Sequence, residues 1–192
     1  MSRGAAAGPD GVLRCPWALS APDYLGYHDL EWGSPLHGDN AMFERLTLEA
    51  FQSGLSWLII LRKRPAFRSA FAGFSIGDVA EFDDGDVERL LVDAGIVRNR
   101  SKIEAAVANA RVALTIDGGL SAMLWSYAPE ARKAPSTLDD VPGVTPESTA
   151  LSQDLKRRGM TFVGPTTAYA LMQATGMVDD HLVGCVGRRL PV

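Results

Sequence analysis

Apolar residues recur at helical spacing along most of this chain, and this periodicity constrains its fold more than any other feature. Between Asp39 and Gly54 apolar side chains return every three or four positions, which places them on one face of an α-helix. No stretch alternates apolar and polar residues between turn dipeptides, as paired strands do. The sequence therefore predicts an all-α fold. Further helices are expected over residues 84–94, over about 103–114, from Thr145 or Thr149 to Gly159, and from Pro165 onward.

Two segments frame this helical region. Residues 1–11 are rich in alanine and glycine and lack the apolar stretch of a secretory signal, so we expect a flexible extension on a cytoplasmic protein. Residues 12–192 are expected to form one unit, with a helical core over about 39–176 and with segments 12–38 and 177–192 beside it. The apolar run that comes closest to a membrane span, Leu55 to Leu61, is far shorter than the roughly 20 apolar residues that cross a bilayer. We expect no membrane association. No feature of the sequence requires an oligomer, so we expect a monomer.

Two cysteines and three histidines occur in the chain, and four of these five residues form a symmetric pattern. Cys15 and His28 stand near the front, and His181 and Cys185 near the back. On a helix, His181 and Cys185 would share a face because they are four positions apart. Two thiolates and two imidazoles suit one zinc ion in a closed structural site. Such a site would join the two ends of the chain.

The alternative is that both cysteines are small buried apolar residues and that the histidines are unrelated. The front pair lacks the short C-x-x-C spacing of many zinc sites, so this alternative stays open on spacing alone. Asp29 and Asp180 neighbour the histidines; they are candidates to support the imidazoles, or they face solvent.

A helix with a basic end, a short turn at Gly164 and a new helix from Pro165 follow one another late in the chain. Gly164 would let a phosphate approach the backbone closely. The first turn of the new helix, with Thr166 and Thr167, would present unpaired N–H groups and a favourable dipole. Such a site holds a DNA phosphate independently of sequence. A plain elbow between two helices explains the pattern equally well.

Five segments together resemble the DNA-3-methyladenine glycosylase I family, within the helix-hairpin-helix superfamily of DNA glycosylases. They are RCPW at 14–17, YHDLEWG at 27–33, LEAFQSGLSW at 48–57, DAGIVRNRSKI at 93–103 and FVGPTTAYALMQATG at 162–176. The resemblance spans about 14–185, and the set is highly specific although no single segment carries it. It implies the fold of that superfamily and hydrolysis of the N-glycosidic bond of 3-methyladenine, with double-stranded DNA containing alkylated bases as the partner.

The resemblance also implies a metal. At the positions that match Cys15, His28, His181 and Cys185, members of this family bind one structural zinc ion. The spacing argument and the resemblance therefore point to the same four ligands.

A glycosylase extrudes its target nucleotide into a pocket, and a methylated adenine is cationic there. Such a base calls for an aromatic face and a hydrogen-bond acceptor. By resemblance, Glu49 and Tyr27 would hydrogen-bond the base and serve as the catalytic residues, and Trp57 would stack on it. Trp17 and Tyr24 complete the expected base pocket, and Trp32 is a further aromatic residue in the same half of the chain.

These residues could also have purely structural roles. Arg45 precedes Glu49 by four positions, so the two side chains could form an ordinary surface salt bridge. Aromatic residues are also commonly core residues.

Two positions bear on mechanism. Superfamily members that also cleave the DNA backbone carry a Schiff-base lysine just after the hairpin glycine, where this chain has Pro165, Thr166 and Thr167. We therefore expect a monofunctional enzyme. Asp179 stands where many superfamily members place a catalytic aspartate and where this family often has asparagine; we expect it to act structurally, with a catalytic role as the alternative.

Two other functions remain open at this point. One is a glycosylase of the same fold that acts on a broader range of alkylated purines. The other is a non-catalytic, zinc-containing DNA-binding module, which would have no reason to keep Glu49, Tyr27 and Trp57 convergent.

Overall fold

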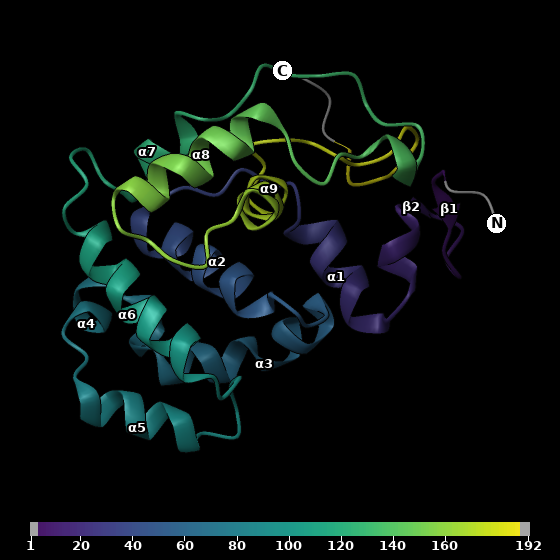
Figure 1. Ribbon diagram of the computed structural model, residues 1–192. Helices are drawn as coiled ribbons and strands as arrows, with labels where there is room; N and C mark the ends of the chain where they lie inside the picture. Colours follow the sequence, from purple (N-terminus) through teal and green to yellow (C-terminus); the bar gives the residue numbers. More distant parts are fainter. Residues whose placement is uncertain (1–3, 189–192) are drawn as a thin grey trace.

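The computed structural model describes residues 4–188, and helices make up most of it (Figure 1). The predicted helical class is confirmed, and within residues 4–188 the exception is one short antiparallel pair of strands. The α-helices are α1 (Pro22–Leu30), α2 (Asp39–Gln52), α3 (Trp57–Ala70), α4 (Ile76–Ala80), α5 (Asp84–Val92), α6 (Arg100–Ala113), α7 (Leu120–Trp125), α8 (Pro146–Arg157) and α9 (Pro165–Ala174). The strands are β1 (Ala6–Ala7) and β2 (Leu13–Arg14), and 3-10 turns lie at Pro16–Leu19, Ala72–Phe74 and Leu138–Asp140.

Helix α2 is the central element of the core. It packs against α3, α6, α7 and α9, and nearly all of its apolar side chains are fully buried. Phe51 from its last turn meets Phe67 of α3 edge to face at 4.8 Å between ring centroids, a geometry that aromatic pairs prefer. Because α2 is held on so many sides, the polar residues near its C-terminal end have fixed positions.

The helix boundaries follow local capping chemistry. Thr145, rather than Thr149, caps α8, and its side-chain oxygen accepts a hydrogen bond from the Ser148 N–H. Asp39 is the first residue of α2 and not its cap. Gly38 takes the cap position, and the Asp39 carboxylate instead accepts a hydrogen bond from the Ser121 N–H in the first turn of α7, at 2.8 Å.

The two ends of the described chain lie together beside the helical core (Figure 1). The Val186 N–H donates to the Leu13 carbonyl at 2.8 Å, and the Gly33 N–H donates to the Gln173 carbonyl at 3.1 Å. Cys15, Leu182 and Cys185 form a small apolar cluster of their own. The association of the segments on either side of the core therefore creates a second, separate centre of burial.

The extension expected over residues 1–11 includes β1, which pairs with β2 through Ala6 and Ala7. Residues 1–3 lie outside the described part of the chain, and the flexibility of the extension stays a prediction. Within residues 4–188, no helix is long and apolar enough to cross a membrane.

Candidate active site

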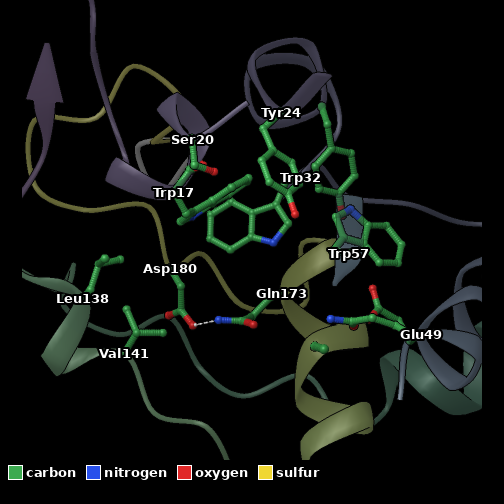
Figure 2. A pocket seen from close by; sticks show the side chains of 13 residues that line it. Trp17, Ser20, Tyr24, Trp32, Glu49, Trp57, Leu138, Val141, Gln173 and Asp180 are labelled. Atoms are coloured by element: carbon green, nitrogen blue, oxygen red, sulfur yellow. Dashed lines mark hydrogen bonds between the residues drawn. The ribbon is translucent and has the colours of Figure 1, made fainter. Parts of the chain in front are cut away.

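A cavity of about 510 Å³ lies between α1, the end of α2, the start of α3 and α9 (Figure 2). It is of the size that holds a small ligand. The sequence-predicted residues Trp17, Tyr24, Tyr27, Glu49 and Trp57 all line this cavity, although they come from separate elements. The structure thus brings together every residue expected in the base pocket.

Glu49 presents an acidic group to this cavity. It lies in the last turns of α2 and is only 5% exposed, and the structure shows its carboxylate near the ring of Trp57 (Figure 2). Burial raises the pKa of Glu49 to about 8, against a smaller opposing effect of the Arg45 charge. The side chain is therefore an acceptor whose ionisation becomes more favourable when a cation enters the cavity.

The surface salt bridge considered for Arg45 and Glu49 does not form. Arg45 is 7% exposed, and its guanidinium donates to Glu31 at 3.4 Å. It also lies over the ring of Tyr27, 5.7 Å from the centroid. Arg64 from α3 donates twice to the same Glu31 carboxylate, at 2.5 and 2.8 Å. Glu31 therefore anchors the guanidinium that lies over the Tyr27 ring, and within residues 4–188 Glu49 forms no ion pair.

Aromatic rings form the opposite wall. The rings of Tyr27 and Trp57 are 5.5 Å apart and tilted by 43°. Trp17 packs edge-on against Trp32 at 5.1 Å and against Tyr24 at 5.6 Å. Such mutual packing holds each ring in place at little entropic cost on binding. The cavity is therefore a preformed slot in which flat aromatic surface lies beside the Glu49 carboxyl group.

Several residues of the cavity escaped the sequence analysis. Gln52 follows Glu49 by three positions on the same helix face, so helical spacing could have identified it. Gln173 of α9 and Asp180 carry no such signal, because they reach the cavity from the other end of the chain. The remaining additional lining residues are Ser20, Leu138, Val141 and Ala170.

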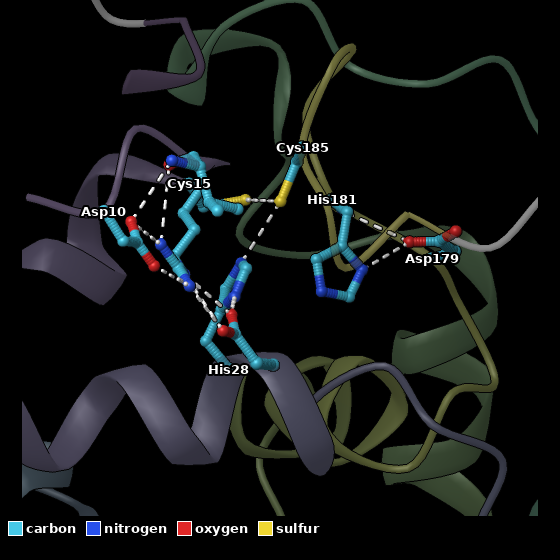
Figure 3. A network of polar contacts seen from close by, with 9 residues as sticks. Asp10, Cys15, His28, Asp179, His181 and Cys185 are labelled. Carbon is cyan, nitrogen blue, oxygen red and sulfur yellow. Dashed lines mark hydrogen bonds and ion pairs between the residues drawn. The ribbon is translucent and has the colours of Figure 1, made fainter. Parts of the chain in front are cut away.

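Beside this cavity, three of the four predicted metal ligands converge (Figure 3). The ligand atoms of Cys15, His28 and Cys185 all lie within 4.8 Å of one another, and all three residues are buried. The two sulfur atoms are 3.7 Å apart, and Cys185 Sγ lies 3.3 Å from His28 Nε2. The hydrogen bond that the Cys15 thiol donates to Cys185 Sγ lowers the pKa of Cys185 below its usual value, which favours a thiolate there.

His181 lies next to this cluster, but not as predicted. No helix includes His181 or Cys185, and the segment instead forms turns, so the expected helical spacing is wrong. The ring centroid of His181 nevertheless lies 5.0 Å from that of His28. Its Nε2 atom is buried and has no hydrogen-bond partner in the described structure. A buried polar nitrogen without a partner is costly, which is consistent with a missing ligand bond.

The local backbone makes room for the His181 ring. Gly33 has a left-handed φ of +73°, and a Cβ at this position would lie 2.7 Å from His181 Cε1. Only glycine adopts this conformation without strain and leaves the space free. This explains why the YHDLEWG segment must end in glycine.

Carboxylates orient both imidazoles (Figure 3). His28 Nδ1 lies 2.7 Å from Asp29 Oδ1, and His181 Nδ1 lies 2.8 Å from Asp179 Oδ1. The contact at His28 leaves its Nε2 atom to face Cys185 Sγ, and the contact at His181 leaves its Nε2 atom as the ring nitrogen without a hydrogen-bond partner in the described structure, as metal-ligating histidines require. Asp29 thus has the supporting place considered for it, whereas Asp179 takes the place considered for Asp180, which lines the cavity instead.

The turn between α8 and α9 is tightly fixed. Asn109 of α6 exchanges two hydrogen bonds with the Thr161 backbone, at 2.9 and 3.0 Å, and the Ser152 hydroxyl donates to the Val163 carbonyl at 2.6 Å. Gly164 caps α9 with an ordinary φ of −62°.

The first turn of α9 faces outward. Thr166 is exposed, and Gly164 and Thr167 are half-buried. A Cβ added at Gly164 would meet no other atom within 4 Å. Neither backbone conformation nor packing within the described chain therefore requires glycine at position 164.

A family model and two curated relatives all relate this chain to methyladenine glycosylases. The family model of methyladenine glycosylases matches residues 17–188. DNA-3-methyladenine glycosylase 1 of Escherichia coli (strain K12) is 44% identical over 178 residues, covering 90% of this chain and 95% of that protein. DNA-3-methyladenine glycosylase of Haemophilus influenzae is 40% identical over 180 residues, covering 91% and 97%.

A solved structure agrees with these relatives. The structure that describes 3-methyladenine recognition by 3-methyladenine DNA glycosylase I from Staphylococcus aureus superposes with a TM-score of 0.88 at 38% identity. It covers 93% of this chain and 98% of that one. Sequence and fold thus agree over almost the whole length.

Proposed function

The chain belongs to the methyladenine glycosylase family, and from this premise we propose how its own residues carry out base excision. The protein is a DNA glycosylase that releases 3-methyladenine from alkylated DNA. The observation that carries the mechanism is the convergence of Glu49, Tyr27 and Trp57 on one cavity. A DNA-binding module without catalytic activity would have no use for a buried carboxylate with a raised pKa facing aromatic rings.

In this proposal the cavity receives the extruded base. Trp57 and Tyr27 offer their faces to the cationic ring, and Glu49 accepts hydrogen bonds from its edge. The cation favours the ionised form of Glu49, so binding the lesion offsets the cost of the buried charge. The methylated base is already a good leaving group: the glycosidic bond breaks with its electrons passing to the base, which leaves as neutral 3-methyladenine. Water forms the new bond to C1′ of the sugar and releases its proton to solvent.

The absence of a lysine from the cavity lining supports a monofunctional reaction. Among the described residues that line the cavity, none can form a Schiff base with the sugar, and Pro165, Thr166 and Thr167 stand where such a lysine would lie. Asp179 is also absent from this lining and holds His181 Nδ1 instead, which supports a structural role. The same proposal includes double-stranded DNA as the substrate, a monomeric enzyme and action in the cytoplasm.

We further propose that Cys15, His28, His181 and Cys185 hold one zinc ion. The donor set is the one zinc prefers, three donor atoms already converge, and the fourth, His181 Nε2, is buried without a partner. Four protein ligands supply no open position, so the ion acts as a structural link. His28 follows Tyr27 on α1, so the same helix orients one ligand and one pocket wall.

The function is tested by a base-release assay. DNA treated with a methylating agent is incubated with the protein, and the free bases are separated and quantified. The proposal predicts release of 3-methyladenine, an abasic product with an intact backbone, and no covalent adduct in the presence of borohydride. Release of a broad set of methylated purines at similar rates would favour the broader-range alternative, and a trapped adduct would refute the monofunctional reaction.

We also propose that the first turn of α9 grips a DNA phosphate through Gly164 and the amides that follow it. Two observations support this proposal. The space beside Gly164 is open, and no packing contact within the described chain requires glycine there. Hydrogen bonds from Asn109 and Ser152 hold the turn in place. The approach of a phosphate to these amides needs the absence of a side chain.

Gly164→Ala is therefore expected to fold normally and to bind DNA about tenfold more weakly, because the added methyl group displaces the phosphate. Thermal unfolding and fluorescence anisotropy with duplex DNA measure the two effects. Gly143→Ala is the matched control, since a Cβ there also meets no atom within 4 Å. Equal DNA affinity of both variants and the unsubstituted protein would remove the phosphate site from the proposal.

A further inference from the structure

Asp180 and Gln173 form a second polar wall of the base cavity, and nothing above gives either residue a role in binding the base. Asp180 is completely buried at its side chain, and its Oδ2 atom accepts a hydrogen bond from Gln173 Nε2 at 2.8 Å. Figure 2 shows this contact and shows the Gln173 carbonyl oxygen turned away from Asp180. Both residues line the cavity that contains Glu49.

The Asp180 carboxylate is itself held from outside the cavity. Tyr169 of α9 donates its hydroxyl to Oδ2 at 2.5 Å, and the Arg132 guanidinium donates to Oδ1 and pairs with its charge. Arg132 also lies over the Tyr169 ring, 5.8 Å from the centroid. Neither Tyr169 nor Arg132 belongs to the cavity lining. Asp180 is therefore positioned by residues that do not reach a bound base.

This arrangement fixes the direction of the Gln173 amide. A carboxylate that faces a guanidinium is an acceptor only, so it must meet the N–H side of the amide rather than its carbonyl. A reversed amide would place two acceptor oxygens against each other in a buried site, which is costly. The carbonyl oxygen Oε1 is therefore presented to the cavity, and it accepts no hydrogen bond from the described residues.

We propose that Asp180 positions Gln173 as a second hydrogen-bond acceptor for the extruded base, and that this acceptor selects adenine bases over guanine bases. The inference rests on the proposed function of the cavity. An adenine carries an exocyclic amino group with two N–H donors, whereas a guanine presents a carbonyl oxygen at the same ring position. Two acceptors, Glu49 and Gln173, suit the amino group, and both would face the guanine oxygen without a partner.

A site built to accept hydrogen bonds discriminates strongly, because a mismatched base leaves buried polar groups unpaired. Asp180 takes part as a positioning residue, since it acts through Gln173 and not on the base. Its contribution should therefore appear in the ratio of methyladenine release to methylguanine release rather than in overall activity alone.

The test measures methyladenine and methylguanine released from the same methylated DNA under single-turnover conditions. Gln173→Met keeps the length of the side chain but removes the acceptor, and Asp180→Asn lets the Gln173 amide turn its N–H side toward the cavity. In both variants the ratio of methyladenine to methylguanine release is expected to fall about tenfold, with the loss confined to methyladenine.

Tyr169→Phe is the matched control, because it removes one donor to Asp180 but leaves the amide direction fixed by the carboxylate. Its ratio should remain that of the unsubstituted protein. An unchanged ratio in Gln173→Met, or an equal loss of both bases, would overturn the inference, and Gln173→Met decides even if Asp180→Asn does not fold. Failure of the proposed function would look different, since the unsubstituted protein would then release neither base.

Discussion

Glu49→Ala is expected to reduce single-turnover excision of 3-methyladenine by about two to three orders of magnitude and to leave affinity for undamaged DNA within about threefold. The carboxylate is the acidic acceptor of the cavity, and a preorganised charge in a buried site contributes this much to a reaction. Nonspecific binding depends on phosphate contacts, and Glu49 is too buried to make any. Base release from methylated DNA and anisotropy with duplex DNA measure the two quantities.

An isosteric variant separates charge from shape. Glu49→Gln keeps the side-chain volume, so a comparable loss of excision would assign the effect to the charge. Weakened DNA affinity with normal excision in Glu49→Ala would refute the pocket assignment.

Substitution of Glu49 is expected to lower activity but to raise stability at high pH, because the carboxyl group is buried. The pKa of Glu49 is about 8 in the folded chain against 4.5 for an ordinary glutamate. Between these values the folded chain holds a proton that the unfolded chain has lost, so this group's contribution to the free energy of unfolding falls as the pH rises. Glu49→Gln should therefore unfold at a higher temperature than the unsubstituted protein at pH 9, and at the same temperature near pH 4.

Loss of the proposed zinc ion should have the second largest effect. The purified protein is expected to contain one zinc ion per chain, and its removal by a chelator should lower the melting temperature by about 10 °C. The reason is that the ligands lie on two segments distant in sequence, 12–38 and 177–188, which are otherwise joined by few hydrogen bonds. Removal also leaves buried His181 Nε2 without a partner.

Cys185→Ser should reproduce this loss and abolish the bound zinc. His37→Gln is the control, because His37 stacks on Trp125 at 4.6 Å and lies outside the cluster. Elemental analysis and thermal unfolding give the readouts. A protein free of zinc with an unchanged melting temperature would contradict the structural role.

The sequence predicted the central elements of the fold because their periodicity is strong. Helices α5, α6 and α8 each have a buried and an exposed face, and the capping side chains of Asp83, Asn99 and Thr145 mark their starts. Helix α1 was not predicted, because its apolar and polar residues do not separate into two faces; it is held by packing against α3 and the Pro16–Leu19 turn. Short helices such as α4 carry too few residues to show a period.

The candidate site was predictable where one segment contains several of its residues. Glu49 and Trp57 stand in one matched segment, and both face the cavity. His181 was predicted with the right neighbours but the wrong local structure, since burial and Gly33 rather than helical spacing place its ring. Asp180 and Gln173 required coordinates, because the direction of the Gln173 amide depends on the Asp180 carboxylate, and Arg132 reaches that carboxylate from a distant part of the chain.

Titration with free 3-methyladenine tests the central claim most directly, namely that Glu49 and the aromatic wall hold the methylated base. Trp17, Trp32 and Trp57 line the cavity, whereas Trp125 does not, so binding should change the tryptophan fluorescence. We predict saturable quenching in the unsubstituted protein, and binding weakened at least tenfold in Glu49→Ala. Equal affinity of the two proteins for 3-methyladenine, or no saturable change in either, would contradict the account.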